Sequence, residues 1–178
     1  MSAQDDLDES IVLRPHDPSW LGEANKLLSN IADRLHDLGV QIEHIGSTAV
    51  PGLEAKPIID LLVGLSDPQD INEAAKRLSA DGWRDLGEAG IVGRRYMRMR
   101  GSIASNLHIV EIHQEHWVNN LLLRDFLRSH PDEAAAYADV KRKALEDGHT
   151  RLLAYSSAKA KQISVLLSKA TAWSQHHG

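Results

Sequence analysis

The sequence predicts an α+β domain that approaches the α/β type, with a central mixed β-sheet flanked by helices and a helical C-terminal half. Two observations support this fold class. Up to about residue 113 the spacing of apolar residues alternates between helical and strand periods, whereas from about residue 115 it stays helical. The 178 residues include 42% hydrophobic residues and no cysteine, so one core can form without disulfide bonds. We therefore expect a single domain over residues 11–178, with an α/β core over about 11–113 and C-terminal helices over about 114–178.

Residues 1–10, MSAQDDLDES, are acidic and polar, and we expect this N-terminal segment to be flexible. It lacks the basic and then apolar order of a secretion signal, and no apolar run approaches the roughly 20 residues of a membrane-spanning helix. Together with the absence of cysteine, this pattern favours a cytoplasmic protein that does not bind membranes.

The net charge of −5 argues against a dedicated nucleic-acid binder, because such proteins need a clustered basic surface. The charge is nevertheless uneven, since residues 141–178 hold seven Lys or Arg against two acids. One interpretation is a solvated basic face on a C-terminal helix, and the other is contact between that face and a phosphate-rich ligand. The sequence leaves the oligomeric state open, including a homo-oligomer.

The first helix is expected to begin at Asp17-Pro18, a capping residue followed by proline, and to end before Gly39. Asp67-Pro68 repeats the same start signal, and Gly82 ends that second helix. The remaining elements follow from apolar spacing and turn residues. Strands are expected at 40–45, 58–65, 83–88, 91–100 and 106–113, and C-terminal helices at 117–129, 131–147 and 152–173.

The segment EHIGSTAVPGLEAKPIIDLLV, residues 43–63, contains the strongest candidate site. Gly46, Ser47 and Thr48 follow a strand, and such small residues allow a phosphate to approach the main chain and bind its amides. An ordinary structural turn would use the same residues. Asp60 lies inside an apolar strand, where a carboxylate is costly unless it is paired or binds a cation. The alternative is a structural acid paired with Lys56 or an arginine.

This segment, together with LRDFLRSHPDEAAAYADVKRKA over 123–144, resembles the GrpB family, also called UPF0157, of the nucleotidyltransferase superfamily. The resemblance extends over nearly the whole chain from RPHDPSW onward. It implies a nucleotidyltransferase-type fold in which Gly46 and Ser47 hold nucleotide phosphates and Asp60 binds magnesium. His44 and Lys56 lie in the same signature without an assigned task, although Lys56 is placed in sequence to reach a phosphate.

Leu62 departs from the pattern of active members of that superfamily, which usually carry a second acid two positions after the first. Residues two apart share one face of a strand, so an acid there would join Asp60 in a two-metal clamp. With leucine at this position the strand alone cannot form the clamp. One divalent ion could still be held by Asp60, substrate phosphates and water.

A further ligand is expected from NLHIVEIH, residues 106–113, because the third acid of the superfamily lies on a later strand. If 107–112 is a strand, His108 and Glu111 lie on opposite faces, and only one of them can point toward Asp60. The family tends to carry a histidine near this place, which favours His108, whereas Glu111 is the more ordinary magnesium ligand. A hydrogen-bonded strand histidine and an edge glutamate are the alternative.

The segment GRRYMRMR offers a separate basic feature, because Arg94 and Arg98 alternate to one side of a strand and suit a phosphate. The alternative is a solvent-facing side of the sheet. His113 and His116 lack the additional ligands of a recognised zinc spacing, so no zinc is expected.

These features predict a metal-dependent nucleotidyltransferase that moves a nucleoside monophosphate from a nucleoside triphosphate to a small-molecule acceptor, with Mg²⁺ or Mn²⁺ as cofactor. Asp60, His108 and Glu111 would be its catalytic residues, and Asp60 and Glu111 its metal ligands. Leu62 supports an alternative, a catalytically degenerate protein that binds a nucleotide or another phosphorylated ligand as a sensor or accessory subunit.

Overall fold

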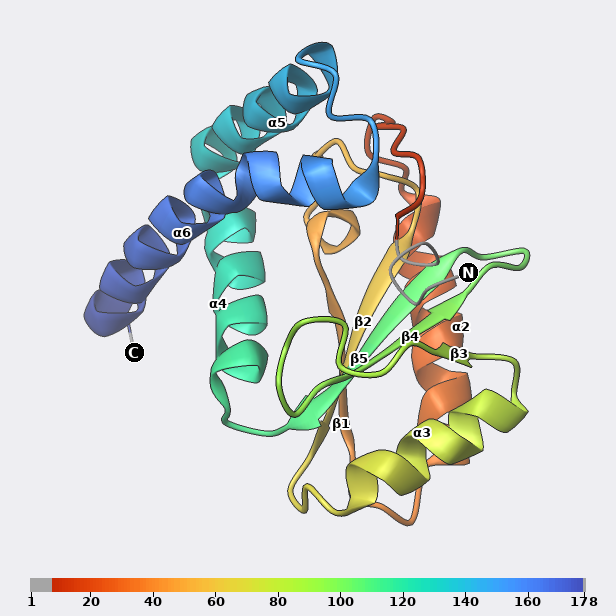
Figure 1. Cartoon of the computed structure of the whole chain (residues 1–178). Helices are drawn as coiled ribbons and strands as arrows, with labels where there is room; N and C mark the ends of the chain where they lie inside the picture. The colour runs from red at the N-terminus through yellow and green to blue at the C-terminus, as the bar shows by residue number, and fades with distance from the viewer. Residues whose placement is uncertain (1–7, 178) are drawn as a thin grey trace.

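The structure, a computed structural model, describes residues 8–177 and contains a mixed five-stranded sheet with helices on both faces (Figure 1). The strand order is β1-β2-β5-β4-β3, in which β2 and β5 are parallel and the other neighbours are antiparallel. The strands are β1 (Gln41–Ile45), β2 (Ile59–Leu65), β3 (Arg84–Asp85), β4 (Arg95–Met99) and β5 (Ser105–Glu111). The predicted α+β class with a central mixed sheet is therefore confirmed. Residues 1–7 of the segment expected to be flexible lie outside the described residues.

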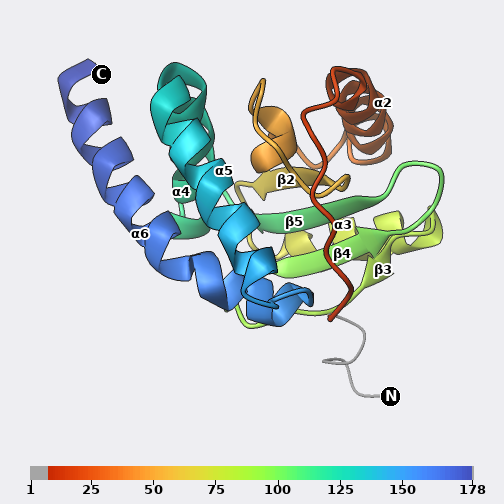
Figure 2. The ribbon, with the colours of Figure 1, turned by 90° about the horizontal axis from the view of Figure 1, so that it is seen from above.

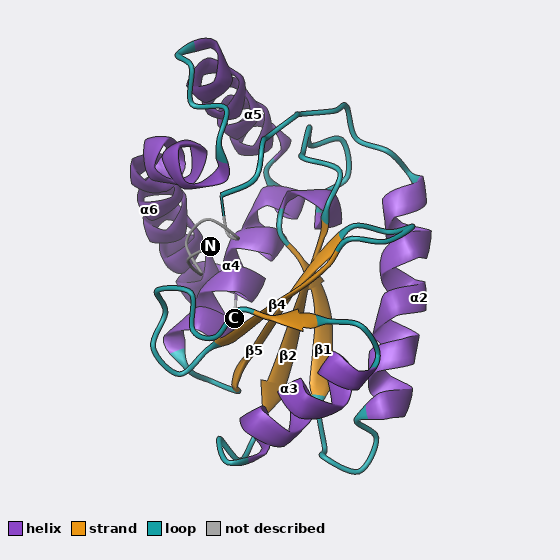
Figure 3. Ribbon diagram, turned by 45° about the vertical axis from the view of Figure 1, so that its right-hand side comes forward, coloured by secondary structure: helices purple, strands orange, loops and turns teal. Residues whose placement is uncertain are grey.

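The helices gather in two groups (Figures 2 and 3). They are α2 (Ser19–Arg34), α3 (Asp70–Ala80), α4 (Glu115–Ser129), α5 (Pro131–Glu146) and α6 (Leu152–His177), with a short 3-10 helix η1 (Ser47–Ala49) after β1. The helices α4, α5 and α6 lie together on one side of the molecule, and α2 and α3 lie on the other. The three predicted C-terminal helices are thus all present.

Both predicted helix starts are capped by an aspartate. The backbone N–H of Ser19 donates to Oδ1 of Asp17 at 2.8 Å, and that of Gln69 donates to Oδ1 of Asp67 at 2.8 Å. These bonds satisfy amides that have no partner within the helix. The first helix ends at Arg34 rather than next to Gly39, and the intervening residues form turns.

The strand expected over 91–100 is shorter than the sequence suggested. β4 begins at Arg95, and residues 91–94 belong to a loop that the Arg94 side chain closes. Its guanidinium donates to the carbonyl oxygens of Glu88 at 3.0 Å and Ala89 at 2.9 Å. The strand expected over 83–88 is reduced to the two residues of β3.

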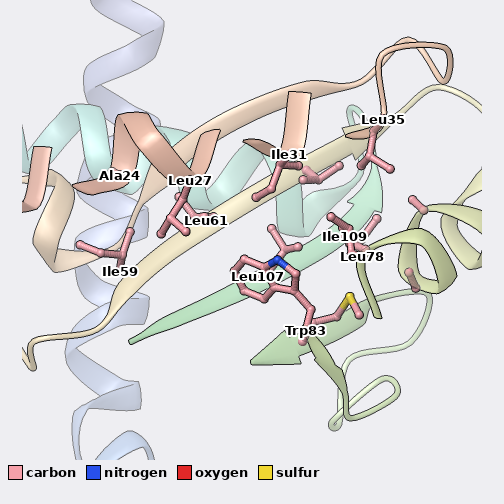
Figure 4. Packing of buried hydrophobic residues seen from close by; sticks show 14 of the residues in the cluster. Ala24, Leu27, Ile31, Leu35, Ile59, Leu61, Leu78, Trp83, Leu107 and Ile109 are labelled. Carbon is pink, nitrogen blue, oxygen red and sulfur yellow. The ribbon is translucent and has the colours of Figure 1, made fainter. Parts of the chain in front are cut away.

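The main core lies between the sheet and helices α2 and α3, where Ile31 and Leu78 pack with Leu61 and Ile109 (Figure 4). Alternate residues of the same strands face α4, and Leu62 and Val110 pack there on Trp117. Asp60 is two residues before Leu62, so it belongs to the face on the α4 side. The sheet therefore carries its polar site on the side of the C-terminal helices.

The loop after η1 is held by the C-terminal helices. Val50 and Leu53 are buried in a second cluster with Phe126 of α4, Tyr137 of α5 and Leu166 of α6. This packing fixes the Gly46-Ser47 turn between the end of β1 and the helical half. Across residues 8–177, no helix has the length and apolar character needed to cross a membrane.

Candidate functional site

Gly46 begins the turn between β1 and η1 with φ 72° and ψ −170°, a conformation confined essentially to glycine. A Cβ at this position would lie 2.9 Å from Oδ2 of Asp60. The glycine is therefore required both for its backbone conformation and for the close approach of the Asp60 carboxylate. The sequence-predicted turn and acid are parts of one site.

Asp60 lies on β2 and is held by two groups that both contact Oδ1. Asn106, its neighbour on β5, donates from Nδ2 at 2.7 Å, and Nζ of Lys56 lies 3.8 Å away. Burial alone would raise the pKa of the Asp60 carboxyl, but Lys56, His108 and Asn106 outweigh it and hold the pKa below its usual value. Asp60 is therefore an anion, and it has the Lys56 partner that the sequence offered as an alternative to a metal.

His108 lies on β5 and contributes to the same cavity as Asp60. Its Nδ1 is 3.2 Å from a guanidinium nitrogen of Arg94, which can only donate, so Nδ1 accepts. Burial and the Arg94 charge lower the pKa of His108 to about 3, so the ring is neutral and carries its proton on Nε2. With this tautomer, Nε2 donates hydrogen bonds and has no lone pair for a metal ion.

A cavity of about 230 Å³ lies above Gly46, Ser47 and Asp60. One side comes from the α/β half and includes Lys56 and His108, while the helical half contributes Arg124, Tyr137, Lys141, Tyr155 and Lys159. Among the described residues that line it, Asp60 is the single carboxylate. The cavity therefore has an excess of positive charge, which suits an anion.

Lys141 and Lys159 bring two of these charges from α5 and α6. Lys141 is 1% exposed and donates from Nζ to Oγ of Ser47 at 3.2 Å and to the backbone carbonyl of Glu54. Burial lowers the pKa of Lys141 to about 7 and that of Lys159 to about 8. Lys141 also lies over the ring of Tyr137 and Lys159 over that of Tyr155, so the partners of both ammonium groups are mainly uncharged, and a bound phosphate would add a charged partner.

His44 and Thr48 connect β1 to the turn that follows it. His44 is buried on β1, and its Nε2 lies 2.9 Å from Oγ1 of Thr48. Burial lowers the pKa of His44 to about 4. Thr48 lines the cavity. Of the residues predicted to bind phosphate, four line the cavity: Gly46, Ser47, Thr48 and Lys56. His44 does not line it and instead contacts Thr48.

Three predicted site residues do not line the cavity above Asp60. Glu111 pairs with Leu65 at the far end of β5, five positions beyond the partner of Asp60, and lines a different cavity. Arg94 closes the loop before β4, as described above. Arg98 is 6% exposed and donates from Nε to the hydroxyl of Tyr96 at 3.1 Å. Neither arginine lines the cavity above Asp60.

The donor set around Asp60 does not fit a two-metal centre. Within residues 8–177, no group of three or more histidine, aspartate or glutamate side chains is arranged to hold a metal ion. Asn106 faces Asp60 with its amide nitrogen, while its Oδ1 accepts from Arg100 at 2.9 Å. A single ion could contact Oδ2 of Asp60 and would take its other ligands from phosphate and water.

Sequence reasoning missed Lys141, Lys159 and Asn106. Lys141 lies inside the segment that resembled the family, and Lys159 belongs to the basic C-terminal run, where contact with a phosphate-rich ligand was one of two interpretations. Asn106 could have been found from the strand pairing, because a parallel neighbour of Asp60 shares its face. None of the three has a local motif of its own.

The comparisons with known proteins agree with this geometry. The family model described as GrpB protein matches residues 10–169. A UPF0157 protein of Pseudomonas aeruginosa is 33% identical over 178 residues, covering 95% of this chain and 71% of that protein. A UPF0157 protein of Bacillus subtilis is 33% identical over 135 residues, and the match covers 75% of this chain but only 39% of that protein. A dephospho-CoA kinase of Mycobacterium leprae is 27% identical over 191 residues, covering 91% of this chain and 47% of the kinase.

Solved structures give the same assignment of fold. The crystal structure of the conserved protein GrpB from Enterococcus faecalis superposes with a TM-score of 0.79 at 28% identity, covering 89% of this chain and 96% of that one. Cid1, an RNA terminal uridylyl transferase, gives a TM-score of 0.53 at 15% identity, covering 71% of this chain and 40% of Cid1. At that identity the similarity to Cid1 shows the fold alone, which is the nucleotidyltransferase fold. The sequence match over residues 10–169 and the close structural match together show that this chain belongs to the GrpB family.

Proposed function

We propose that this protein binds the phosphate groups of a nucleotide-type ligand in the cavity above Asp60. The observation that carries the proposal is the placement of Lys56, Lys141 and Lys159 around the Gly46-Ser47 turn in a cavity with one described carboxylate. Asp60 is paired with Lys56 and is the single carboxylate among the described residues of the lining, so three lysines face one acid and a ligand can balance the excess positive charge. Two or more negative charges on one ligand, as in a diphosphate or triphosphate, meet that requirement.

The turn and His108 add hydrogen-bond donors to these charges. Oγ of Ser47 and the main chain of the turn can donate to phosphate oxygens, as small-residue turns after strands commonly do. His108 can donate from Nε2 into the same cavity. The nucleotidyltransferase fold supports a nucleotide as the ligand class, and the kinase relative adds dephospho-CoA as a compound to test.

Calorimetric titration with the four nucleoside triphosphates and dephospho-CoA, each with Mg²⁺ and with EDTA, tests the proposal. We expect binding in EDTA, and a loss of about tenfold or more in affinity in Lys159→Met because one charge-assisted contact is removed. Lys161→Met is the matched control, since Lys161 is exposed on the same helix and does not line the cavity. Equal affinities of the two variants for every ligand bound by the wild type would refute the proposal, as would an absence of binding.

Nucleotidyl transfer is the second candidate function. The specific observation in its favour is the position of Asp60 Oδ2 directly beside the Gly46 backbone, where a carboxylate could share a cation with phosphates on the turn. Asp60 would hold one Mg²⁺ or Mn²⁺ ion, and the ion would neutralise charge on the reacting phosphates. The acceptor would be a small molecule.

Pyrophosphate release distinguishes transfer from binding alone. A transferase requires release from a nucleoside triphosphate in the presence of a divalent ion and a panel of small acceptors. We expect Asp60→Asn to abolish this release while ligand binding in EDTA stays within a few fold of wild type, because the lysines hold the phosphates. Release that is unchanged in Asp60→Asn would contradict the role of Asp60 in transfer.

A further inference from the structure

A second and larger cavity, of about 1260 Å³, adjoins the phosphate cavity. It is bounded by α3, the loop before β4, the end of β5, α4 and α6, and representative residues from these elements are Ile71, Val92, Val110, Asn119 and Leu167. Its walls come from five separate segments of the chain, so no local sequence pattern marks it.

The two cavities adjoin each other. Asn120 and Leu123 of α4 and Ile163 of α6 line both of them. At the junction, Nδ1 of His108 is 3.2 Å from Arg94 and 3.2 Å from Nε2 of His116. His108 faces the phosphate cavity, while Arg94 and His116 face the larger one, so the three side chains form a shared wall.

The charges in the larger cavity differ from those in the phosphate cavity. Its arginines are already bound within the protein, because Arg94 donates to the carbonyl oxygen of Glu88 and Arg95 donates to Oδ1 of Asn72 at 2.8 Å. Glu88 in turn accepts from the backbone N–H of Gly93 at 2.7 Å. Glu111 and Glu115 add two further carboxylates, so the lining is net negative, and apolar side chains and amides provide much of the rest. Such a surface disfavours phosphate and suits an organic group that carries no negative charge and has a few hydrogen-bonding atoms.

A nucleotide is too large for the phosphate cavity alone, so a nucleotide ligand would need a second compartment. Pockets for small organic ligands usually have about 300–1,000 Å³, so the 230 Å³ cavity can hold phosphates but not a nucleoside as well. We propose that the larger cavity binds the uncharged organic body of the ligand whose phosphates lie over Gly46 and Ser47. This inference rests on the proposed function and extends it: the ligand is bipartite, with an anionic end and a neutral body in separate compartments.

The test compares inorganic tripolyphosphate, which has only the anionic end, with ATP and dephospho-CoA. We expect wild type to bind at least one of the two organic ligands about tenfold or more tightly than tripolyphosphate, since only those ligands reach the larger cavity. Asn119→Trp places an indole in the part of this cavity next to the phosphate cavity and should reduce that advantage, while leaving tripolyphosphate affinity unchanged. Val118→Trp is the matched control, because Val118 is the exposed neighbour on α4 and lines neither cavity.

Gln114→Trp, at another position of the same cavity, provides a second blocking variant in case Asn119→Trp does not fold. The inference is overturned if both folded blocking variants bind the organic ligands as wild type does, or if wild type binds tripolyphosphate as tightly as ATP and dephospho-CoA. Either result leaves the phosphate cavity intact as long as Lys159→Met still weakens tripolyphosphate binding. A failure of wild type to bind tripolyphosphate, ATP and dephospho-CoA overturns both proposals.

Discussion

At the scale of single residues, removing the Lys141 charge is expected to weaken ligand binding without weakening the folded state at low pH. Its pKa in the folded protein is about 7, well below the 10.5 of an exposed lysine. The protonated lysine therefore opposes folding at pH values below about 7, and this penalty declines as pH rises from 7 toward 10.5. At low pH the free-energy penalty for burying this charge is on the order of 5 kcal/mol. This exceeds the roughly 1–3 kcal/mol that the loss of a buried hydrogen bond would cost.

At pH 6 we expect the free energy of unfolding of Lys141→Met to equal or exceed that of wild type. At pH 9 we expect this gain in stability to be lost. Urea unfolding at the two pH values measures the free energy of unfolding. Phosphate-ligand affinity should fall about tenfold or more in the same variant. Lys143→Met, exposed on the same helix, is the control and should match wild type in both respects. A loss of stability that is equal at pH 6 and pH 9 would show that burial of the charge is not what opposes folding.

Gly46 gives the second prediction at this scale. Alanine at 46 would bring a Cβ to 2.9 Å from Oδ2 of Asp60 and would adopt a backbone conformation close to glycine-only. Gly52 also has a positive φ, 78°, but a Cβ there meets nothing within 4 Å. We expect Gly52→Ala to cost about 1 kcal/mol in the free energy of unfolding and Gly46→Ala about 1–3 kcal/mol more. Equal costs in denaturant unfolding would mean that contact with Asp60 does not constrain residue 46.

These residues also show what sequence alone could establish about the site. Gly46, Ser47 and Asp60 were recognisable because a carboxylate inside an apolar strand requires a physical reason, and the small turn residues near it, ordinary in themselves, can bind a phosphate. Lys141 and Lys159 were not, because a lysine on a helix is ordinary and only tertiary packing decides whether it meets solvent or a cavity. Glu111 was misplaced because strand alternation gives the face of a residue but not its distance along the paired strand.

At the scale of elements, the parallel pairing of β2 and β5 determines what surrounds Asp60. Asn106 lies opposite Asp60 in this pairing and donates to its Oδ1 at 2.7 Å. Aspartate at 106 would place a second carboxylate beside the first, and repulsion between the two would favour a bound divalent ion. Arg100, which donates to Oδ1 of Asn106, would keep an acceptor.

Asn106→Asp should therefore gain metal-dependent stability. In the absence of nucleotide, we expect saturating Mn²⁺ to raise its thermal midpoint by about 4 °C or more, with a smaller change in wild type. Asn106→Leu removes the donor without adding charge and should respond to Mn²⁺ no more than wild type does. A variant Asn106→Asp that melts at the same temperature with Mn²⁺ and with EDTA would contradict this account of the site.

The elements themselves were predictable to different degrees. Both helices that begin after Asp-Pro were predicted, because the capping hydrogen bond is a local interaction between residues two apart in the sequence. The strand expected over 91–100 was too long, because the pattern of apolar residues does not reveal that Arg94 turns back to bind Glu88 and Ala89. A tertiary contact of one side chain ended a strand that local propensity would have continued.

At the scale of the whole molecule, the phosphate cavity lies between the two halves of the chain. The α/β half contributes Gly46, Asp60 and Lys56, and the helical half contributes Lys141 and Lys159. The sequence indicated both halves but not their arrangement, because the packing of Val50 and Leu53 against three C-terminal helices joins residues far apart in the chain. The site therefore depends on the helices as much as on the strand that carries its acid.

Ligand binding is expected to depend on pH because the two cavity lysines of the helical half titrate near neutral pH. Lys141 and Lys159 have pKa values of about 7 and about 8 in the free protein, and a phosphate binds their protonated forms. Binding must therefore become weaker as pH rises, since each lysine that is neutral in the free protein must take up a proton when the ligand binds. Tripolyphosphate is suitable as the probe because it has no base or amine, and the titration of its terminal phosphates is the same for wild type and variants, so a difference between them comes from the protein.

We expect the affinity for tripolyphosphate, measured by calorimetry at constant ionic strength, to fall about tenfold or more between pH 7 and pH 9.5. In Lys159→Met one of the two titrating groups is gone, so the fall should be smaller although the affinity at pH 7 is already reduced. Lys161→Met should follow the wild-type profile. Proton uptake is read from the dependence of the binding enthalpy on buffer ionisation. Its difference between wild type and Lys159→Met should be close to zero at pH 6 and should increase toward pH 8.5. Parallel affinity profiles of wild type and Lys159→Met across this range would show that Lys159 does not bind the ligand.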